Sequence, residues 1–285
     1  MALLPVAWYI IFCYVPMYGI QLAFKEFRPS RGIWGSPWVG FEHFERFFSS
    51  IYFGRVVGNT LIINVYSLIF GFPVPIIFAL LLNEIRFNPF KRIIQTITYF
   101  PHFISTVIVV SMLTMLFAAD TGVLNFTGIF NNGVNIPITN DPAFFRPLYI
   151  GSGIWQGFGF SSVLYIAAIS AIDQQLYEAA RVDGASRFQN IIHITLPCIM
   201  PAIIIRLLLQ LGSMFSQGAE KIILMYTPST YVVADVISTY VYRVGLTGAN
   251  YSFGTAVDLF NTIINFITLI VFNTIARRMG ETSLW

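Results

Sequence analysis

The chain has 285 residues, of which 56% are hydrophobic and only 10% are charged, and its formal net charge is +3. Its mean hydropathy is +0.72. Soluble domains carry about 25% charged residues, so this composition excludes an ordinary soluble domain and indicates an integral membrane protein.

Six apolar runs predict six membrane-spanning helices, because each run is close to the ~20 residues that cross a bilayer. The runs are continuously apolar rather than alternating, which favours helices over the strands of a barrel. The first run has no basic flank before it and no small-residue cleavage site after it, so we interpret it as a retained span. The predicted spans are residues 3–24, 57–82, 96–119, 148–172, 194–216 and 257–276.

Lysine and arginine near the span ends indicate the orientation in the membrane. The short segments 83–95 and 173–193 and the tail after residue 276 are dense in these residues. We therefore predict that both chain ends are cytosolic, and we expect a basic tail ahead of Met1. The external segments are rich in Gly, Pro, Asn and aromatic residues, which is typical of ordered surface loops. These predicted external segments are 25–56, 120–147 and 217–256.

Sequence motifs for enzyme chemistry are absent. None of the three lysines, Lys25, Lys91 and Lys221, follows a glycine, so the Gly-Lys core of a phosphate-binding loop is missing. Neither a Gly-x-Ser-x-Gly elbow nor a His-Glu-x-x-His pair occurs. Cys13 and Cys198 fall inside predicted spans and the histidines are far apart in sequence, so neither a disulfide framework nor a metal cluster is indicated. We expect no enzyme activity and no cofactor in this chain; if ATP drives it, another chain is the ATPase.

The segment 173–197 joins the fourth and fifth predicted spans and contains the strongest local pattern. Gly184 readily takes the backbone angles that end a helix. Ser186 is placed to cap a second helix, and Gln189 three residues on completes a Ser-x-x-Gln capping box. Small side chains before the turn would let a partner surface approach closely. The pattern predicts a helix–turn–helix elbow facing the cytosol, and the alternative is an ordinary amphipathic loop between two spans.

This segment resembles the EAA loop of the permease subunits of bacterial ATP-binding cassette (ABC) importers. That loop has Glu-Ala-Ala, three residues, Gly, nine residues, Ile, one residue and Leu-Pro, and this chain meets every position. The resemblance implies that the segment is a coupling helix seated in a groove of an ATPase subunit. The residues that it assigns to coupling are Glu178, Ala179, Ala180, Arg181, Asp183, Gly184, Arg187, Ile194, Leu196 and Pro197.

The resemblance extends over nearly the whole chain. Residues 14–19, 35–40 and 234–243 are similar to the oligosaccharide branch of the family, and residues 280–285 are similar to the ends of permeases for aldouronate, alginate and other polysaccharide-derived substrates. It implies an all-α integral membrane protein with the type I ABC importer permease architecture. The chain would be one permease domain over residues 1–285, multi-pass in the bacterial inner membrane.

The resemblance also implies an assembly around this chain. A second, homologous permease would complete the translocation pathway, and two ATPase subunits would bind ATP and Mg²⁺. An external solute-binding protein would deliver an oligosaccharide, lipid would surround the spans, and no nucleic acid is expected. Basic residues on the external surface together with Arg206 favour an acidic, alginate- or aldouronate-like sugar.

No fixed motif marks substrate contacts, so we predict them from polar and aromatic residues in the spans. Sugar hydroxyls need donors and acceptors, and sugar rings stack on aromatic faces. The alternative for each amide or hydroxyl is a bond to a neighbouring helix. A charge such as Arg206 inside a span is either functional or paired with an acid such as Asp258. The candidates are Asn64, Tyr66, Trp155, Gln156, Arg206, Gln210, Ser213, Ser216, Gln217, Asn261 and Asn265.

Apolar residues recur at helical spacing between Tyr231 and Val244, which predicts an amphipathic helix on the external surface. This helix would either contact the solute-binding protein and gate the pathway, or lie as an anchor in the bilayer interface. Two other classes of protein stay open: a channel or ion-coupled secondary transporter, and a structural scaffold. The complete EAA pattern argues against both.

Overall fold

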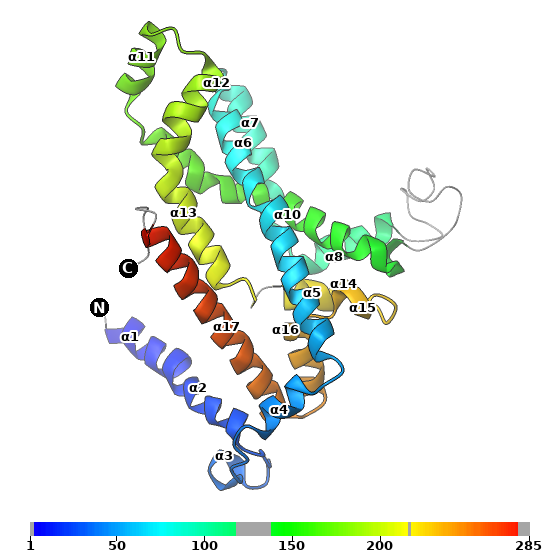
Figure 1. Cartoon of the computed structure of the whole chain (residues 1–285). Coiled ribbons are helices and arrows are strands. Elements are labelled where there is room, and N and C mark those ends of the chain that lie inside the picture. The colour runs from blue at the N-terminus through cyan, green and yellow to red at the C-terminus, as the bar shows by residue number, and fades with distance from the viewer. Residues whose placement is uncertain (1–2, 118–137, 216–217, 279–285) are drawn as a thin grey trace.

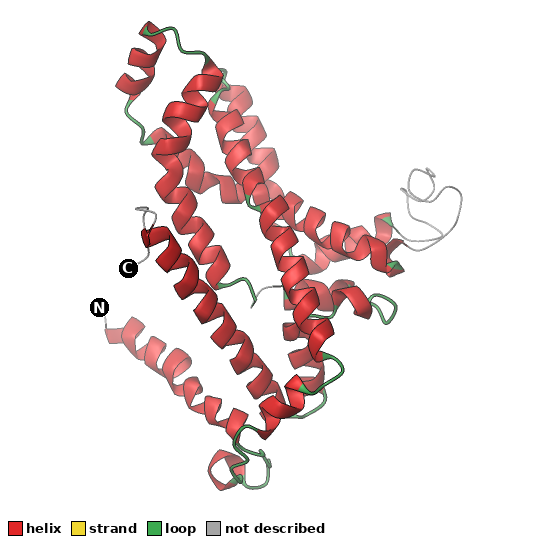
Figure 2. Ribbon diagram, in the orientation of Figure 1, coloured by secondary structure: helices red, strands yellow, loops and turns green. Residues whose placement is uncertain are grey.

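The computed structural model describes residues 3–117, 138–215 and 218–278. These parts of the chain form helices joined by short loops, and their one strand-like pairing is a bridge between Lys25 and Trp38 (Figure 2). Four helices are long and apolar enough to cross a membrane, and the number reaches six if each of two bent helix pairs is one span. The predicted all-α membrane fold is confirmed.

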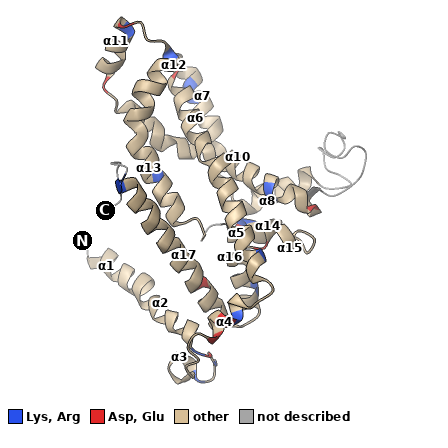
Figure 3. Ribbon diagram, viewed as in Figure 1, with Lys and Arg blue, Asp and Glu red and all other residues tan. Residues whose placement is uncertain are grey.

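Two ends of the molecule can be told apart (Figure 1). One end, which we call the elbow end, carries α11 (Gln174–Val182) and α12 (Arg187–Asn190). The opposite end carries α3 (Gly32–Gly35) and α4 (Glu42–Phe48). Lys and Arg are prominent around α11, α12 and α7, both signs of charge occur near α4, and the long helices between them are mostly uncharged (Figure 3).

The N-terminal helix covers residues 3–24, as predicted, and most of its apolar side chains are exposed. Its last part, η2, packs against α17 and α4. The predicted spans 57–82, 194–216 and 257–276 also fall on long helices, each of which begins before the predicted start. The elements are α1 (Leu3–Tyr9), η1 (Ile10–Tyr14), α2 (Val15–Met17), η2 (Tyr18–Phe24), α5 (Phe53–Tyr66), η3 (Ser67–Gly71), α6 (Pro73–Asn83), η6 (Ile191–Thr195), α13 (Leu196–Gly212) and α17 (Tyr251–Arg278).

Prolines explain local distortions in three of these helices. The π turns η1, η3 and η6 each end two residues before a proline, namely Pro16, Pro73 and Pro197. A proline ring clashes with the carbonyl four residues earlier and has no N–H to donate to it. The wider turn relieves this clash: the Leu196 N–H donates to the carbonyl of Ile191, five residues back. The fifth span is therefore distorted directly after the predicted elbow.

The predicted span over residues 96–119 is not one continuous helix. The helix formed by α7 and η4 turns by 97° into α8. Pro101 lies in the turn, and the Ser105 hydroxyl accepts a hydrogen bond from the first turn of α8. An apolar run shows that a segment is buried or in lipid, but it does not show where the segment bends. The elements are α7 (Asn88–Tyr99), η4 (Phe100–Phe103) and α8 (Thr106–Leu116).

The helix α10 (Pro142–Ser170), which has 29 residues, organises the core and contains most of the predicted span 148–172. It packs against α6, α7 and α13. Opposite α7 it has Gly159, where any side chain would collide with the backbone of Thr98. The core between α6, α10 and α13 consists of Ile76, Ala79, Tyr165, Ile169, Ile172, Ile199 and Ile203.

The predicted amphipathic surface helix over residues 231–244 is also wrong. The chain breaks at Asp235 and Val236, which take extended backbone angles. Ile237 and Tyr240 are buried in a core that includes Phe47. The apolar face predicted for lipid or a partner therefore packs inside the fold. The elements of this segment, residues 218–250, are α14 (Ala219–Met225), α15 (Tyr231–Ala234), α16 (Ile237–Tyr240) and η7 (Val241–Thr247).

Candidate functional site

The elbow turn is formed by backbone hydrogen bonds at the end of α11. Gly184 has a φ of +80°, a conformation that strains any residue with a side chain. The Ala185 N–H donates to the carbonyl of Ala180 at 2.9 Å, and the Gly184 N–H donates to the carbonyl of Arg181 at 3.1 Å. This pair of bonds is the Schellman motif, which ends helices in this way. The predicted role of Gly184 as a helix end is confirmed.

The second half of the elbow is capped as predicted. The Ser186 hydroxyl accepts from the Gln189 N–H at 3.3 Å, and the Gln189 Oε1 accepts from the Ser186 N–H at 2.7 Å. Both bonds of a capping box are present, so a short α12 begins directly after the turn.

The tip of the elbow is open to its surroundings. Val182 is 89% exposed and Phe188 is 70% exposed, and they flank the turn on either side. The coupling candidates Glu178 and Asp183 are exposed as well. Arg187 approaches Glu84 at 3.9 Å, a loose and largely exposed ion pair that contributes little. Apolar side chains on a rigid turn, surrounded by charges, provide a surface for another protein.

The base of the elbow is fixed to the core. The Tyr177 hydroxyl lies 2.9 Å from the hydroxyl of Thr195, which joins α11 to η6. Ile194 and Leu196 pack against the core shared by α6, α10 and α13. These contacts connect the elbow to three long helices. Pro197, the remaining coupling candidate, follows η6 and is exposed.

A cavity of about 300 Å³ lies among η3, α6, α10, α13 and α14. Its wall contains the amides Gln156 and Gln210, aromatic rings and two cationic side chains, Arg206 and Lys221. A mixed wall of this kind, inside a helical membrane protein, suits a polar ligand with apolar ring faces.

Three predicted pathway residues, Gln156, Arg206 and Gln210, line this cavity. Gln156 also donates from Nε2 to the carbonyl of Ile104 at 2.8 Å, so the cavity wall is bonded to the bend between η4 and α8. Asp258 lines a different groove, between η7 and α17. The pairing of Arg206 with Asp258 that the sequence suggested is therefore not made.

Other predicted pathway residues serve the fold itself. Asn261 is buried and donates to the carbonyl of Phe215 at 3.0 Å, and Asn265 accepts from the Phe215 N–H at 2.9 Å. Asn64 donates to the carbonyl of Thr60 within its own helix. These three asparagines therefore fit the alternative interpretation, in which an intramembrane amide bonds within the protein itself.

The remaining candidates are spread over the surface or undescribed. Tyr66 is 44% exposed and Trp155 is 43% exposed, and neither lines the cavity. The Ser213 hydroxyl donates to the carbonyl of Leu209 at 3.2 Å. Ser216 and Gln217 lie outside the described residues.

Sequence reasoning missed Lys221 and Tyr149, which both line the cavity. The segment that holds Lys221 was predicted to be an external loop, so this lysine was not among the pathway candidates. The available signal was weak: Glu220 and Lys221 are charged residues near the start of a short and otherwise apolar helix, α14.

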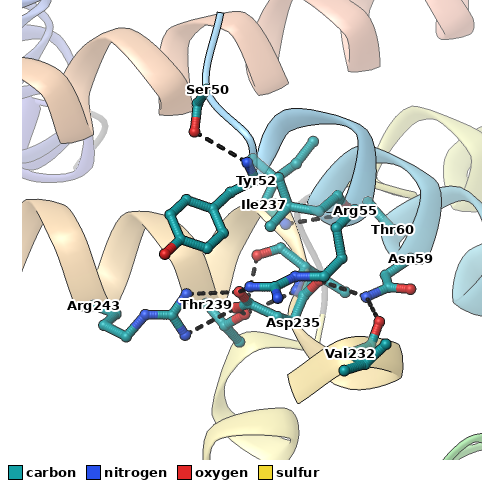
Figure 4. Close-up of polar contacts among 12 residues, drawn as sticks. Ser50, Tyr52, Arg55, Asn59, Thr60, Val232, Asp235, Ile237, Thr239 and Arg243 are labelled. Atoms are coloured by element: carbon teal, nitrogen blue, oxygen red, sulfur yellow. Dashed lines mark hydrogen bonds and ion pairs between the residues drawn. The ribbon is translucent and has the colours of Figure 1, made fainter. Parts of the chain in front are cut away.

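A buried polar cluster lies where α5 meets α15, α16 and η7 (Figure 4). Asp235 is completely buried and accepts from Arg243 through both carboxylate oxygens, at 2.6 and 3.1 Å. It also accepts from Arg55 at 3.3 Å and from the Thr239 hydroxyl at 2.9 Å. The buried carboxylate is thus compensated by two guanidinium groups and a hydroxyl.

Amide and hydroxyl groups extend the same cluster to α10. Asn59 donates to the carbonyls of Val232 and Asp235 at 2.9 and 3.0 Å and accepts from Arg146 at 2.9 Å. The Ile237 N–H donates to the Thr60 hydroxyl at 3.0 Å. These bonds join α5 and α10 to residues 218–250.

A multi-pass helical protein with a polar cavity between its helices and an exposed elbow anchored in its core has the architecture of a transport permease. Residues 71–281 match the family described as binding-protein-dependent transport system inner membrane component, and the chain belongs to this family. It is the transmembrane permease component of an ABC importer and not its ATPase. This assignment excludes the alternatives of a secondary transporter, a channel or a scaffold.

Relatives with similar sequences span almost the whole chain. The chain is 42% identical to protein LplB of Bacillus subtilis (strain 168), over 98% of this chain and 87% of that protein. It is also 42% identical, over the same shares, to the polygalacturonan/rhamnogalacturonan transport system permease protein YteP of that organism.

Solved structures of similar proteins agree with the fold. A chain in the crystal structure of a bacterial alginate ABC transporter, in complex with an alginate pentasaccharide-bound periplasmic protein, has a TM-score of 0.92 at 43% identity. The match covers 100% of this chain and 95% of that one. A chain of a bacterial ABC transporter involved in the import of the acidic polysaccharide alginate has a TM-score of 0.90 at 44% identity, over 99% of this chain and 95% of that one.

Proposed function

We propose that this chain forms half of the translocation pathway of an ATP-driven importer in the bacterial inner membrane, and that its cargo is an acidic oligosaccharide. The substrates for which YteP and the alginate transporters are named, polygalacturonan, rhamnogalacturonan and alginate, support an acidic sugar. So does a cavity that carries Arg206 and Lys221 beside two glutamines. A second permease supplies the other half of the pathway, and a solute-binding protein delivers the sugar.

The elbow, residues 173–197, transmits the work of ATP hydrolysis. ATP and Mg²⁺ bind to two partner ATPase subunits, and this chain binds no cofactor. The observation that carries the proposal is the contrast between an exposed tip, at Val182 and Phe188, and a base bonded through Tyr177 to the span beyond. When an ATPase subunit bound to the tip changes conformation, the tip and α13 move together. Residues 25–56, which carry α3 and α4 at the end opposite the elbow, face the solute-binding protein.

Reconstitution tests this proposal directly. The chain is placed in proteoliposomes with its partner permease, the ATPase subunits and the solute-binding protein. We expect uptake of a uronic acid oligosaccharide that requires both ATP and the binding protein. Uptake that needs neither, or an ATPase that fails to copurify with this chain, contradicts the proposal.

A further inference from the structure

The cavity contains two cationic side chains and no carboxylate partner for them in the described part of the chain. Arg206 and Lys221 both line it. The ion pairs of the described residues lie elsewhere and use other cations: Arg28 with Glu26, Arg55 and Arg243 with Asp235, and Arg187 with Glu84. Cations removed from water are costly unless an anion compensates them.

Lys221 is held in place by α10. Its Nζ donates to the carbonyl of Tyr149 at 2.9 Å and lies 5.0 Å from the centre of the Tyr149 ring. An ammonium has three N–H donors, and this bond uses one of them. Beside Nζ is Gly153, where an added Cβ would be 3.4 Å away, so the wall here carries no side chain that covers the ammonium. Two donors of the ammonium therefore remain for a ligand in the cavity that Lys221 lines.

The position of Tyr149 is itself fixed by a glycine. Gly218, just before α14, has a φ of +97°, and a side chain there would collide with the Tyr149 hydroxyl. The close approach of Tyr149 to this turn seats α14 against α10. Lys221, one turn further along, is therefore preorganised rather than free to swing.

The rest of the wall matches a sugar that carries an anion. Gln156 and Gln210 offer amide donors and acceptors for hydroxyl groups, and Phe72, Phe158 and Tyr165 offer aromatic and apolar surface. A carboxylate bound in the cavity would compensate the positive charge of Arg206 and Lys221 and their partial loss of water.

We propose that Lys221 and Arg206 form a carboxylate-binding subsite in the translocation pathway, at which Lys221 selects uronic acid units over neutral sugars. This proposal rests on the proposed function and adds to it the residues that recognise the charge. Lys221 is thus a specificity-determining residue of the permease, separate from the selectivity of the solute-binding protein.

The test is the ratio of uptake efficiencies for two substrates in reconstituted complexes. One substrate is an oligogalacturonate and the other is the same oligomer with its carboxyl groups reduced to neutral alcohols. The binding protein is the same for every variant, so a change in the ratio belongs to the permease. Lys221→Met should lower uptake of the acidic oligomer by about tenfold or more, as expected for a lost hydrogen bond to a charged group. Uptake of the neutral oligomer should stay within about twofold of wild type.

Matched variants separate the charge from the fold. Lys221→Arg keeps the charge and should keep the preference for the acidic oligomer, and Arg206→Gln should reduce that preference. Lys91→Gln removes a lysine of α7 that does not line the cavity and should leave the ratio unchanged. An unchanged ratio in Lys221→Met, or an equal loss for both oligomers, overturns the inference while leaving the permease assignment intact. Absence of any oligosaccharide uptake by the wild type instead contradicts the proposed function.

Discussion

The elbow is shaped by hydrogen bonds between residues that are close in the sequence. Residues 218–250 are held in place by hydrogen bonds to residues that are far away in the sequence. The bonds that shape the elbow join residues three to five positions apart, such as Ser186 with Gln189 and Ala185 with Ala180. The bonds that hold residues 218–250 span the chain: Asn59 and Val232 are 173 positions apart, and Arg55 and Asp235 are 180 apart. A locally bonded unit keeps its shape while it moves, whereas a segment bonded across the chain is part of the fold.

Burial follows the same division. Residues at the elbow tip, such as Phe188, are exposed, while Asp235, Ile237 and Thr239 in the other region are fully buried. Substitutions in the elbow should therefore impair coupling and leave the fold intact. Substitutions in the buried cluster should unfold the protein. Measurements of stability and coupling on variants of the two regions separate these outcomes.

The largest effect is expected from Asp235→Asn. It leaves Arg243 and Arg55 without a buried counter-charge, and breaking such a group costs about 3–5 kcal/mol. The loss of stability is measured by thermal unfolding of the purified variant, which is monitored by size-exclusion chromatography of heated samples. Glu26→Gln is the control, because the Glu26–Arg28 pair is about half exposed and contributes little. If Asp235→Asn is as stable as the wild type, the buried polar cluster is dispensable for folding, and the contrast between the elbow and residues 218–250 is contradicted.

Gly184→Val should have a smaller effect on stability and a complete effect on transport. A side chain at positive φ costs roughly 1–2 kcal/mol, and here the strain falls on an exposed turn. We expect the complex to insert and melt near the wild-type temperature while the binding protein no longer stimulates ATP hydrolysis. Gly184→Asn is the matched control, since asparagine tolerates this conformation and should retain most coupling. Normal coupling in the valine variant counts against the elbow.

Ser186→Ala removes the cap of α12 and should cost about 1 kcal/mol, mainly within the elbow. Stimulated ATP hydrolysis should fall partially, and the melting temperature should hardly change. Ser186→Asp restores a capping oxygen and should restore activity. If the alanine variant lowers the melting temperature as much as Asp235→Asn does, the elbow is not the independent unit described here.

A pH profile addresses Lys221, the residue of 218–250 to which we assign a transport role. Burial lowers the pKa of Lys221 to about 8, so its ammonium is charged below that pH and loses its proton above it. Uptake efficiency for an acidic oligomer should fall as pH rises through about 8, and Lys221→Arg should abolish that fall. A profile that arginine does not change contradicts the assignment. The elements that contact α14 or share its cavity carry other ionisable groups: Glu220 on α14 itself, Arg146, Tyr149 and Tyr165 on α10, Cys198 and Arg206 on α13, and Tyr240 on α16, while α8 has none.

The sequence alone was sufficient where the interactions are local. Gly184, Ser186 and Gln189 specify the elbow through backbone angles and capping bonds, so their spacing predicts its shape. Long apolar runs likewise predict most of the spans. The bend near Pro101 was missed because hydropathy averages over it, although the proline itself marks a possible break.

The sequence was insufficient where distant residues meet. The periodic apolar positions near Ile237 pack against Phe47 and Val56 rather than against lipid, and periodicity does not distinguish these two environments. The cavity was predicted only in part: Gln156, Arg206 and Gln210 come from helices identified as spans. Lys221 joins them only because α14 folds back against α10.

Site-specific crosslinking is the most direct test of the central claim, which is that an ATPase subunit binds the elbow tip. Both described cysteines, Cys13 and Cys198, are exposed and are first replaced by serine. Phe188→Cys places a thiol at the elbow tip, and Ile51→Cys, at a residue that is 87% exposed toward the opposite end, is the control. We predict that Phe188→Cys forms an adduct with the ATPase subunit that changes with bound nucleotide, and that Ile51→Cys forms none. No adduct at position 188 in a complex that still transports sugar would contradict the account.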